Sequence, residues 1–186
     1  MTNDRNELLG LLYRLSYEER EVTLTSGKKS NFYIDGKQTT CHARGALLTG
    51  RLFYQRIRAA GIPIRGVGGL TMGADPIVAA VSVVSALEND PLHAFLIRKE
   101  PKGHGKQLWI EGDKNLKPGD PVAIVEDVVT SGGSLLKAVE RARAHDLDVK
   151  IALTLVDRGE GGAEFIADHG LQLEALFTIE DLKNWK

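Results

Sequence analysis

Hydrophobic residues follow two alternating patterns along this chain, and together they predict strands that alternate with helices. Leucines at helical spacing over residues 6–15 predict a short opening helix, and residues 43–60 and 76–87 predict two longer ones. Short apolar runs rich in β-branched residues predict buried strands at residues 64–67, 93–98, 122–125, 149–156 and 173–178. This alternation predicts an α/β fold with a mostly parallel central sheet flanked by helices.

The first forty residues show a different pattern. Residues 22–25 alternate between apolar and polar, residues 31–35 are β-prone, and Ser26-Gly27-Lys28-Lys29-Ser30 lies between them. This arrangement predicts a small antiparallel hairpin outside the parallel sheet. No repeat, low-complexity stretch or Pro/Gly linker divides the chain. We therefore expect one domain over residues 1–186, with residues 1–40 contributing a helix and a hairpin.

Composition narrows the range of functions. The 186 residues are 42% hydrophobic and 26% charged with a formal net charge of −1, so nothing global attracts nucleic acid or an acidic membrane. Cys41 is the only cysteine, which excludes an internal disulfide and fits a reducing compartment. The N-terminus lacks a signal-peptide pattern, and the apolar stretch at 77–87 is too short to span a bilayer. We expect a cytoplasmic protein without nucleic-acid or membrane partners.

The most informative stretch is residues 122–134, where a buried-type strand runs into Glu126 and Asp127. Small residues follow over 130–133, and Ser134 is positioned to cap the next helix. A loop of small residues before a helix N-terminus is typical of a phosphate site, because free backbone N–H groups and the helix dipole favour an anion. Carboxylates beside such a site suit the paired hydroxyls of a ribose. The alternative is an ordinary turn with a solvated acid pair.

Two other segments carry candidate chemistry. Gly66-Val67-Gly68 suggests a dinucleotide-binding turn, but the third glycine of that motif falls at Thr71, so the match fails. Residues 98–106 are cationic and contain glycines. Most basic loops are simply solvated, but this one leaves a core strand at the end where parallel sheets bind ligands.

Residues 122–134 resemble the 5-phosphoribosyl 1-diphosphate (PRPP) signature of the type I phosphoribosyltransferases. That signature is an apolar strand, two acids, two apolar residues, Thr, a small residue, Gly, any residue, then Ser or Thr, and every position is filled here. The resemblance implies the type I phosphoribosyltransferase fold, in which the N-terminal helix and hairpin contribute to a hood. It also implies a set of PRPP-binding residues in this stretch: Glu126, Asp127, Val128, Val129, Thr130, Ser131, Gly132, Gly133 and Ser134.

Four further segments resemble the orotate-specific members of that family: residues 26–33, 68–75, 98–104 and 157–161. This resemblance implies transfer of the phosphoribosyl group from PRPP to orotate, giving orotidine 5′-monophosphate and pyrophosphate in de novo pyrimidine (UMP) biosynthesis. Thr130 and Arg158 would bind orotate. Mg²⁺ would be the cofactor, carried mainly by substrate oxygens and water, so no protein ligand is expected.

The resemblance also assigns roles to the cationic segment. Arg98, Lys99, Lys102 and His104 would bind PRPP, and Lys102 and His104 would act with Asp127 in catalysis. Positive charge suits this task because the departing pyrophosphate gains negative charge in the transition state. The resemblance further implies a homodimer in which the loop at residues 99–106 acts in trans, covering the partner's site.

The chain departs from some relatives at two places. They carry a lysine where Thr25 stands, and a Tyr-Lys pair where Thr71-Met72 stands. In related enzymes a cis peptide bond occurs in this second loop, at the position that matches Leu70-Thr71. Two alternatives remain at this point: a purine or xanthine transferase on the same fold, and a non-catalytic regulator that senses PRPP. The regulator would need a nucleic-acid-binding surface, for which the chain has no spare length.

Overall fold

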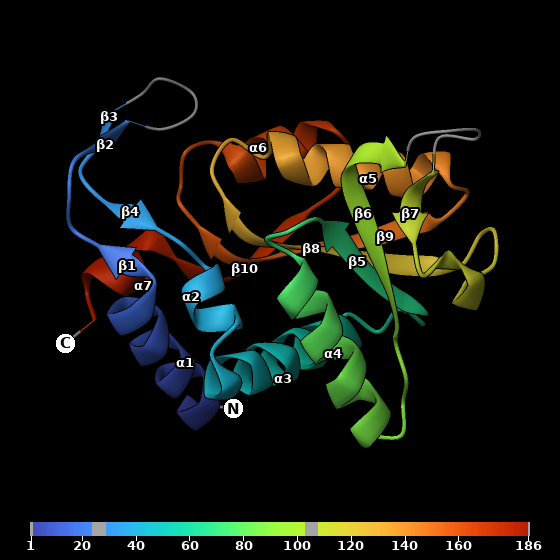
Figure 1. Ribbon diagram of the computed structural model, residues 1–186, viewed down its shortest axis with the longest axis horizontal. Coiled ribbons are helices and arrows are strands. Elements are labelled where there is room, and N and C mark those ends of the chain that lie inside the picture. The colour runs from blue at the N-terminus through green and yellow to red at the C-terminus, as the bar shows by residue number, and fades with distance from the viewer. Residues whose placement is uncertain (1, 24–28, 103–107, 186) are drawn as a thin grey trace.

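The computed structural model describes residues 2–23, 29–102 and 108–185 (Figure 1). The N-terminal part contains α1 (Thr2–Leu15), β1 (Tyr17–Glu18), β2 (Val22–Thr23), β3 (Lys29–Ser30), β4 (Tyr33–Ile34), α2 (Lys37–Thr40) and α3 (Ala43–Ala59). The middle contains β5 (Gly66–Leu70), α4 (Asp75–Leu87), β6 (His93–Lys102), β7 (Leu108–Glu111) and the short 3₁₀ turn η1 (Asp113–Asn115). The rest contains β8 (Pro121–Val129), α5 (Gly133–Ala144), β9 (Asp148–Asp157), α6 (Gly162–Asp168), β10 (Leu173–Thr178) and α7 (Ile179–Lys183).

The described strands of the core form one six-stranded sheet in the order β10-β9-β8-β5-β6-β7. All neighbours are parallel except β7, which runs antiparallel along the edge of β6. This confirms the predicted α/β class with a mostly parallel sheet. Because five parallel strands end at one edge of the sheet, the loops that follow them gather there.

Helices cover both faces of the sheet, as Figure 1 shows. On one face, Leu8 of α1, Phe53 of α3 and Ile77 of α4 pack in one buried cluster with Val67 and Val125 of the sheet. On the other face, α5 and α6 contribute to a second cluster with the sheet, and its members include Phe95, Ile124, Leu135, Val139 and Ile166. The alternation of side chains along each strand explains this division, since successive residues point to opposite faces.

The glycines of β5 have a packing role. A Cβ atom on Gly68 would lie 2.3 Å from the Phe95 ring, and one on Gly69 would lie 2.3 Å from the Val125 carbonyl oxygen and 2.4 Å from the Ala74 Cβ. Real Cβ atoms do not approach that closely, so only glycine fits where the start of α4 and strand β8 press on β5. The glycine-rich run that suggested a dinucleotide motif is therefore explained by close packing.

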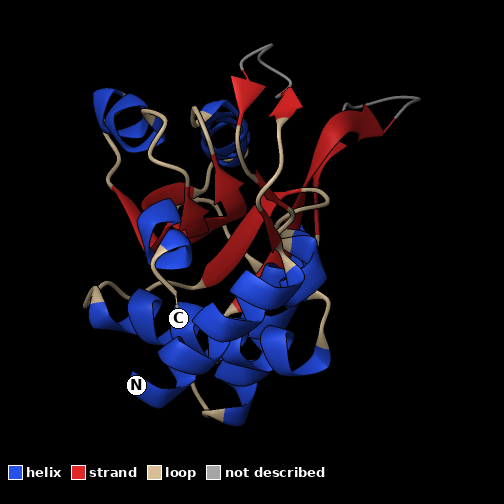
Figure 2. Cartoon of the chain, turned by 90° about the vertical axis from the view of Figure 1, so that its left-hand side faces the viewer, coloured by secondary structure: helices blue, strands red, loops and turns tan. Residues whose placement is uncertain are grey.

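The N-terminal hairpin lies outside the parallel sheet, as predicted, but its pairing is different (Figure 2). β2 pairs with β3 through Val22↔Ser30 and Thr23↔Lys29, whereas β4 pairs with β1 through Tyr17↔Ile34. The prediction paired residues 22–25 with residues 31–35 directly. It missed β1, a strand of two residues that is too short to show an alternating pattern.

Local boundaries also differ from the predictions. β8 continues to Val129, and α5 begins at Gly133 with Gly132 as its N-cap, so Ser134 is not the cap. Gly132 has φ +83°, a conformation that favours glycine. The cis peptide bond joins Thr71 and Met72, one residue after the predicted position. Within the described ranges, no helix is long and apolar enough to cross a membrane.

Candidate active site

The loops at the carboxyl edge of the sheet enclose two adjoining cavities. The first, of about 140 Å³, is lined by Glu126 and by residues 128–135. The second, of about 200 Å³, shares Glu126, Val128 and Ser134 with the first and adds Lys37, Leu70, Thr71, Gly73, Lys99 and Asp127. The two cavities therefore bring together the end of β8 and the start of α5 with parts of α2, β6 and the loop after β5.

The first cavity has the construction of a phosphate cradle. α5 is twelve residues long and begins at Gly133, so unpaired backbone N–H groups and the positive end of the helix dipole face this cavity. The loop packs closely against Gly162, where a Cβ atom would lie only 2.7 Å from the Thr130 carbonyl oxygen, so glycine is needed at this position. Eight of the predicted PRPP-binding residues line the cavity: Glu126, Val128, Val129, Thr130, Ser131, Gly132, Gly133 and Ser134.

The acid pair is more deeply buried than the sequence suggested. Glu126 and Asp127 lie inside β8, with relative exposures of 6% and 9%. The Asp127 N–H donates to Glu126 Oε1 at 3.2 Å, and the Val128 N–H donates to Asp127 Oδ1 at 2.9 Å. Burial, together with the charge of Asp127, raises the pKa of Glu126 well above its usual value of 4.5. The pair therefore retains a proton over a range of pH where two isolated carboxylates would both be charged.

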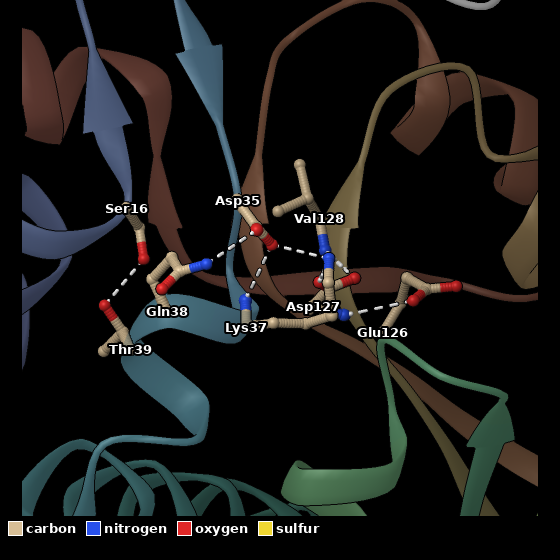
Figure 3. A network of polar contacts seen from close by, with 8 residues as sticks. All are labelled: Ser16, Asp35, Lys37, Gln38, Thr39, Glu126, Asp127 and Val128. Atoms are coloured by element: carbon tan, nitrogen blue, oxygen red, sulfur yellow. Dashed lines mark hydrogen bonds and ion pairs between the residues drawn. The ribbon is translucent and has the colours of Figure 1, made fainter.

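Lys37 provides positive charge beside this pair (Figure 3). Its Nζ lies 2.5 Å from Asp35 Oδ1 and 4.0 Å from Asp127 Oδ2. The hydrogen bond to Asp35 raises the pKa of Lys37, and the charge of Asp127 acts in the same direction. The Ser16 and Thr39 hydroxyls, 2.7 Å apart and buried, tie α2 to the end of α1. Lys37 is not among the residues predicted from the sequence, although its position two residues after the predicted hairpin strand was a usable signal.

The cationic residues predicted over 98–104 do not all lie at the cavities. Lys99 lines the second cavity beside Thr71. The Arg98 side chain instead donates to the Glu100 carbonyl at 3.1 Å and to Glu111 Oε1 at 3.3 Å, so it is not brought to either cavity. The Lys102 side chain and residues 103–107, including His104, lie outside the described part of the chain, and their roles stay predictions.

Arg158 lies in a different part of the same edge, where β9 ends. Its side chain is buried; Nε donates to Glu160 Oε1 at 2.9 Å and Nη2 donates to Ser30 Oγ at 3.1 Å. Its Cζ lies 4.6 Å from the centre of the Phe32 ring, so the hairpin packs directly on the guanidinium. Phe32 and Arg158 line a cavity of about 460 Å³ together with Lys183. Thr130, the other predicted orotate residue, lines the phosphate cradle instead.

The described residues contain no group of three or more His, Cys, Asp or Glu side chains placed to hold a metal ion. Glu126 and Asp127 are nevertheless both at the cavity wall. Mg²⁺ is often bound through one or two carboxylates together with substrate phosphates and water. The donor set at this site therefore fits a magnesium ion that arrives with a phosphorylated substrate.

A parallel sheet with an acid pair in its central strand, followed at once by a phosphate cradle, defines a type I phosphoribosyltransferase. Comparisons with known proteins agree. The orotate phosphoribosyltransferase of Nostoc sp. is 51% identical over 179 residues, which cover 96% of this chain and 85% of that protein. No protein-family model matches the chain.

Solved structures give the same result. The orotate phosphoribosyltransferase of Mycobacterium tuberculosis H37Rv in complex with Fe(III) dicitrate superposes with a TM-score of 0.79 at 38% identity, covering 96% of this chain and 98% of that one. The same enzyme in complex with PRPP gives 0.77 at 35% identity, covering 97% and 99%. This chain belongs to the orotate phosphoribosyltransferase family.

Replacing Glu126 with glutamine tests the proton on the acid pair. The pKa of Glu126 is raised in the folded protein, so the wild type loses stability as pH rises from the unfolded value of about 4.5 through the folded one. The neutral amide does not titrate. We therefore expect the melting temperature of Glu126→Gln relative to wild type to rise between pH 5 and pH 8. A change of about 1 kcal/mol moves the Tm of a chain of this size by about 2–4 °C. A difference that stays constant or falls would contradict a raised pKa.

Proposed function

We propose that this protein transfers the phosphoribosyl group of PRPP to orotate, giving orotidine 5′-monophosphate and pyrophosphate in de novo UMP biosynthesis. The observation that carries the proposal is the buried acid pair directly beside the cradle of residues 128–134. The cradle suits the 5′-phosphate of PRPP, and the acid pair suits the ribose hydroxyls. The complex of the mycobacterial relative with PRPP supports this assignment.

The chemistry follows from the charges around the second cavity. Breaking the bond between the anomeric carbon and pyrophosphate leaves an electron-poor sugar and a strongly anionic leaving group. Asp127 lies at the wall of this cavity, where its charge favours the cationic sugar, and Lys37 and Lys99 line the same cavity. Preorganised charge of this kind stabilises the transition state without reorganisation of solvent. Lys37 also places a cation in the cavity where Thr71-Met72 replaces the Tyr-Lys pair of some relatives.

Arg158 suits the base because orotate carries a carboxylate and two ring carbonyls. Glu160 and Ser30 fix its Nε and Nη2, while Phe32 supports the face of the guanidinium. A guanidinium held in this way has a defined direction, so less freedom is lost when a planar anion binds. The third nitrogen of the guanidinium, Nη1, has no hydrogen-bond partner among the described residues, so its N–H groups are available to orotate.

We further propose that Mg²⁺ enters as its complex with PRPP, held mainly by pyrophosphate oxygens and water, with the acid pair of β8 beside it. The ion would offset negative charge on the leaving group. Lys37, Lys99 and the cradle orient the sugar and its phosphates independently of the metal.

The function is tested by one absorbance assay of orotate consumption with PRPP and Mg²⁺. We expect turnover with orotate, and none above background with hypoxanthine or uracil offered in parallel, because neither carries the carboxylate that Arg158 would bind. Pyrophosphate release should match orotate consumption. Turnover of hypoxanthine without turnover of orotate would instead establish a purine transferase.

Replacing Arg158 with alanine should raise the KM for orotate far more than the KM for PRPP, because only the base loses its partner. A charge-assisted contact of this type is worth about 2–4 kcal/mol. Glu160→Gln is the matched control, since it removes the ion pair and keeps the guanidinium, and it should change the KM for orotate much less. Equal increases for both substrates would show that Arg158 holds the fold or the phosphate.

We also propose a cytoplasmic homodimer, in which the loop at residues 99–106 acts in trans beyond Lys99, which lines the cavity of its own chain. Exposed apolar side chains support an interface between copies: Met72 in the loop after β5 is 69% exposed, and Val83 and Leu87, one turn apart on α4, are 61% and 73% exposed. Exposed large apolar side chains are typical of an association surface when they gather on one face. Met72 directly follows Thr71, which lines the second cavity, so a partner that contacts Met72 would lie next to the site.

Mixing two inactive variants tests this assembly. Lys102→Ala and Asp127→Ala should each be nearly inactive alone. After subunit exchange at equal amounts, half of the dimers are mixed, and each mixed dimer contains one site built from two intact halves. Activity should therefore recover to about a quarter of wild type by random pairing. If the loop serves its own subunit, no intact site forms and the mixture stays inactive.

A further inference from the structure

Arg141 lies on the third turn of α5, away from both cavities, and reaches across to β6. Its Nη1 donates to the Arg98 carbonyl oxygen at 2.5 Å, and its Nη2 donates to the Lys99 carbonyl oxygen at 3.3 Å. Its Cζ lies 4.0 Å from the centre of the Trp109 ring on β7. One side chain thus contacts the backbone of β6 at two consecutive residues and the face of a ring on the neighbouring strand.

Regular sheet pairing is interrupted in this part of β6. Pairing with β5 ends at Leu70↔Ile97, and the pairing with β7 is irregular between Ile97 and Lys102. The carbonyl groups of Arg98 and Lys99 therefore lie beyond the regular ladder, and Arg141 supplies their donors. A planar guanidinium with two parallel N–H groups suits two adjacent carbonyls, and stacking on Trp109 fixes its orientation.

Lys99 connects this contact to the active site. Its carbonyl accepts from Arg141, while its side chain lines the second cavity beside Asp127 and Thr71. The ammonium group is near enough to Glu126 to oppose the burial and the Asp127 charge that raise the pKa of that carboxyl. The placement of the Lys99 ammonium therefore depends on backbone that Arg141 holds.

We propose that Arg141 is a positioning residue that fixes the backbone of Arg98 and Lys99 and so holds the Lys99 ammonium in the PRPP-binding cavity. This inference rests on the proposed function. Arg141 acts from α5, whose first turn forms the phosphate cradle. The same helix thus places donors at the cradle with its first turn and, two turns later, holds the backbone of a cation in the adjoining cavity.

The test measures binding of PRPP with Mg²⁺ by calorimetry in the absence of orotate, so no turnover is needed. Arg141→Ala should weaken PRPP binding by about 10-fold or more, since small displacements of a positioned charge are costly. Arg141→Lys keeps a single donor and should fall in between. Arg143→Ala, which removes an exposed arginine from the same helix, is the matched control and should bind as wild type. Affinity for orotidine 5′-monophosphate, which lacks the pyrophosphate, should be unchanged in Arg141→Ala.

A double-variant cycle separates positioning from general stability. If Arg141 acts through Lys99, Lys99→Ala with Arg141→Ala should bind PRPP no more weakly than Lys99→Ala alone. Additive losses, equal losses for PRPP and orotidine 5′-monophosphate, or an Arg141→Ala variant that matches Arg143→Ala would overturn the inference. If Arg141→Ala does not fold, the same cycle with Arg141→Lys decides. A wild type that does not bind PRPP would overturn the proposed function, and this inference with it.

Discussion

Two carboxylates buried next to each other at the end of β8 impose the constraint on which the site depends. Burial and the charge of Asp127 together raise the pKa of Glu126, because two like charges in a poorly solvated place cannot both be ionised without cost. Lys37 partly offsets this cost, since its Nζ lies 4.0 Å from Asp127 Oδ2. Two loops that contain glycine pack closely against Asp127. A Cβ atom on Gly73 would lie 2.4 Å from Asp127 Oδ1, and one on Gly36 would lie 3.0 Å from the Asp127 Cβ, so glycine lets both loops close around it.

This constraint connects segments that are far apart in sequence. Lys37 comes from α2, Gly73 from the loop after β5, Lys99 from β6 and the cradle from the start of α5, and all of them converge on one strand end. Charged groups that are already oriented act more strongly on a reacting sugar phosphate than groups that must reorganise, and the burial of Glu126 and Asp127 strengthens the interactions of that pair. The parallel sheet makes this arrangement available because its strands end at one edge.

The sequence predicted much of this, because its strongest signals are local. The α/β class follows from the alternation of short apolar runs with amphipathic segments, and the phosphate cradle follows from a contiguous stretch, residues 122–134. What the sequence could not show depends on contacts between distant residues. Lys37 meets Asp127 across ninety positions, and Arg158 meets Ser30 across 128. Strands of two residues, such as β1, contain too few positions to show a period, and the burial of Glu126 depends on neighbours that only the fold supplies.

The most direct test of this account is the titration of the Glu126 carboxyl itself, followed by its ¹³C chemical shift in NMR and assigned by comparison with Glu126→Gln. The account predicts that the pKa of this carboxyl lies well above the usual glutamate value of 4.5, while the fold stays intact. Titration of Glu126 at or below that value would contradict the account, because Glu126 would then be charged in the folded protein despite its burial beside Asp127.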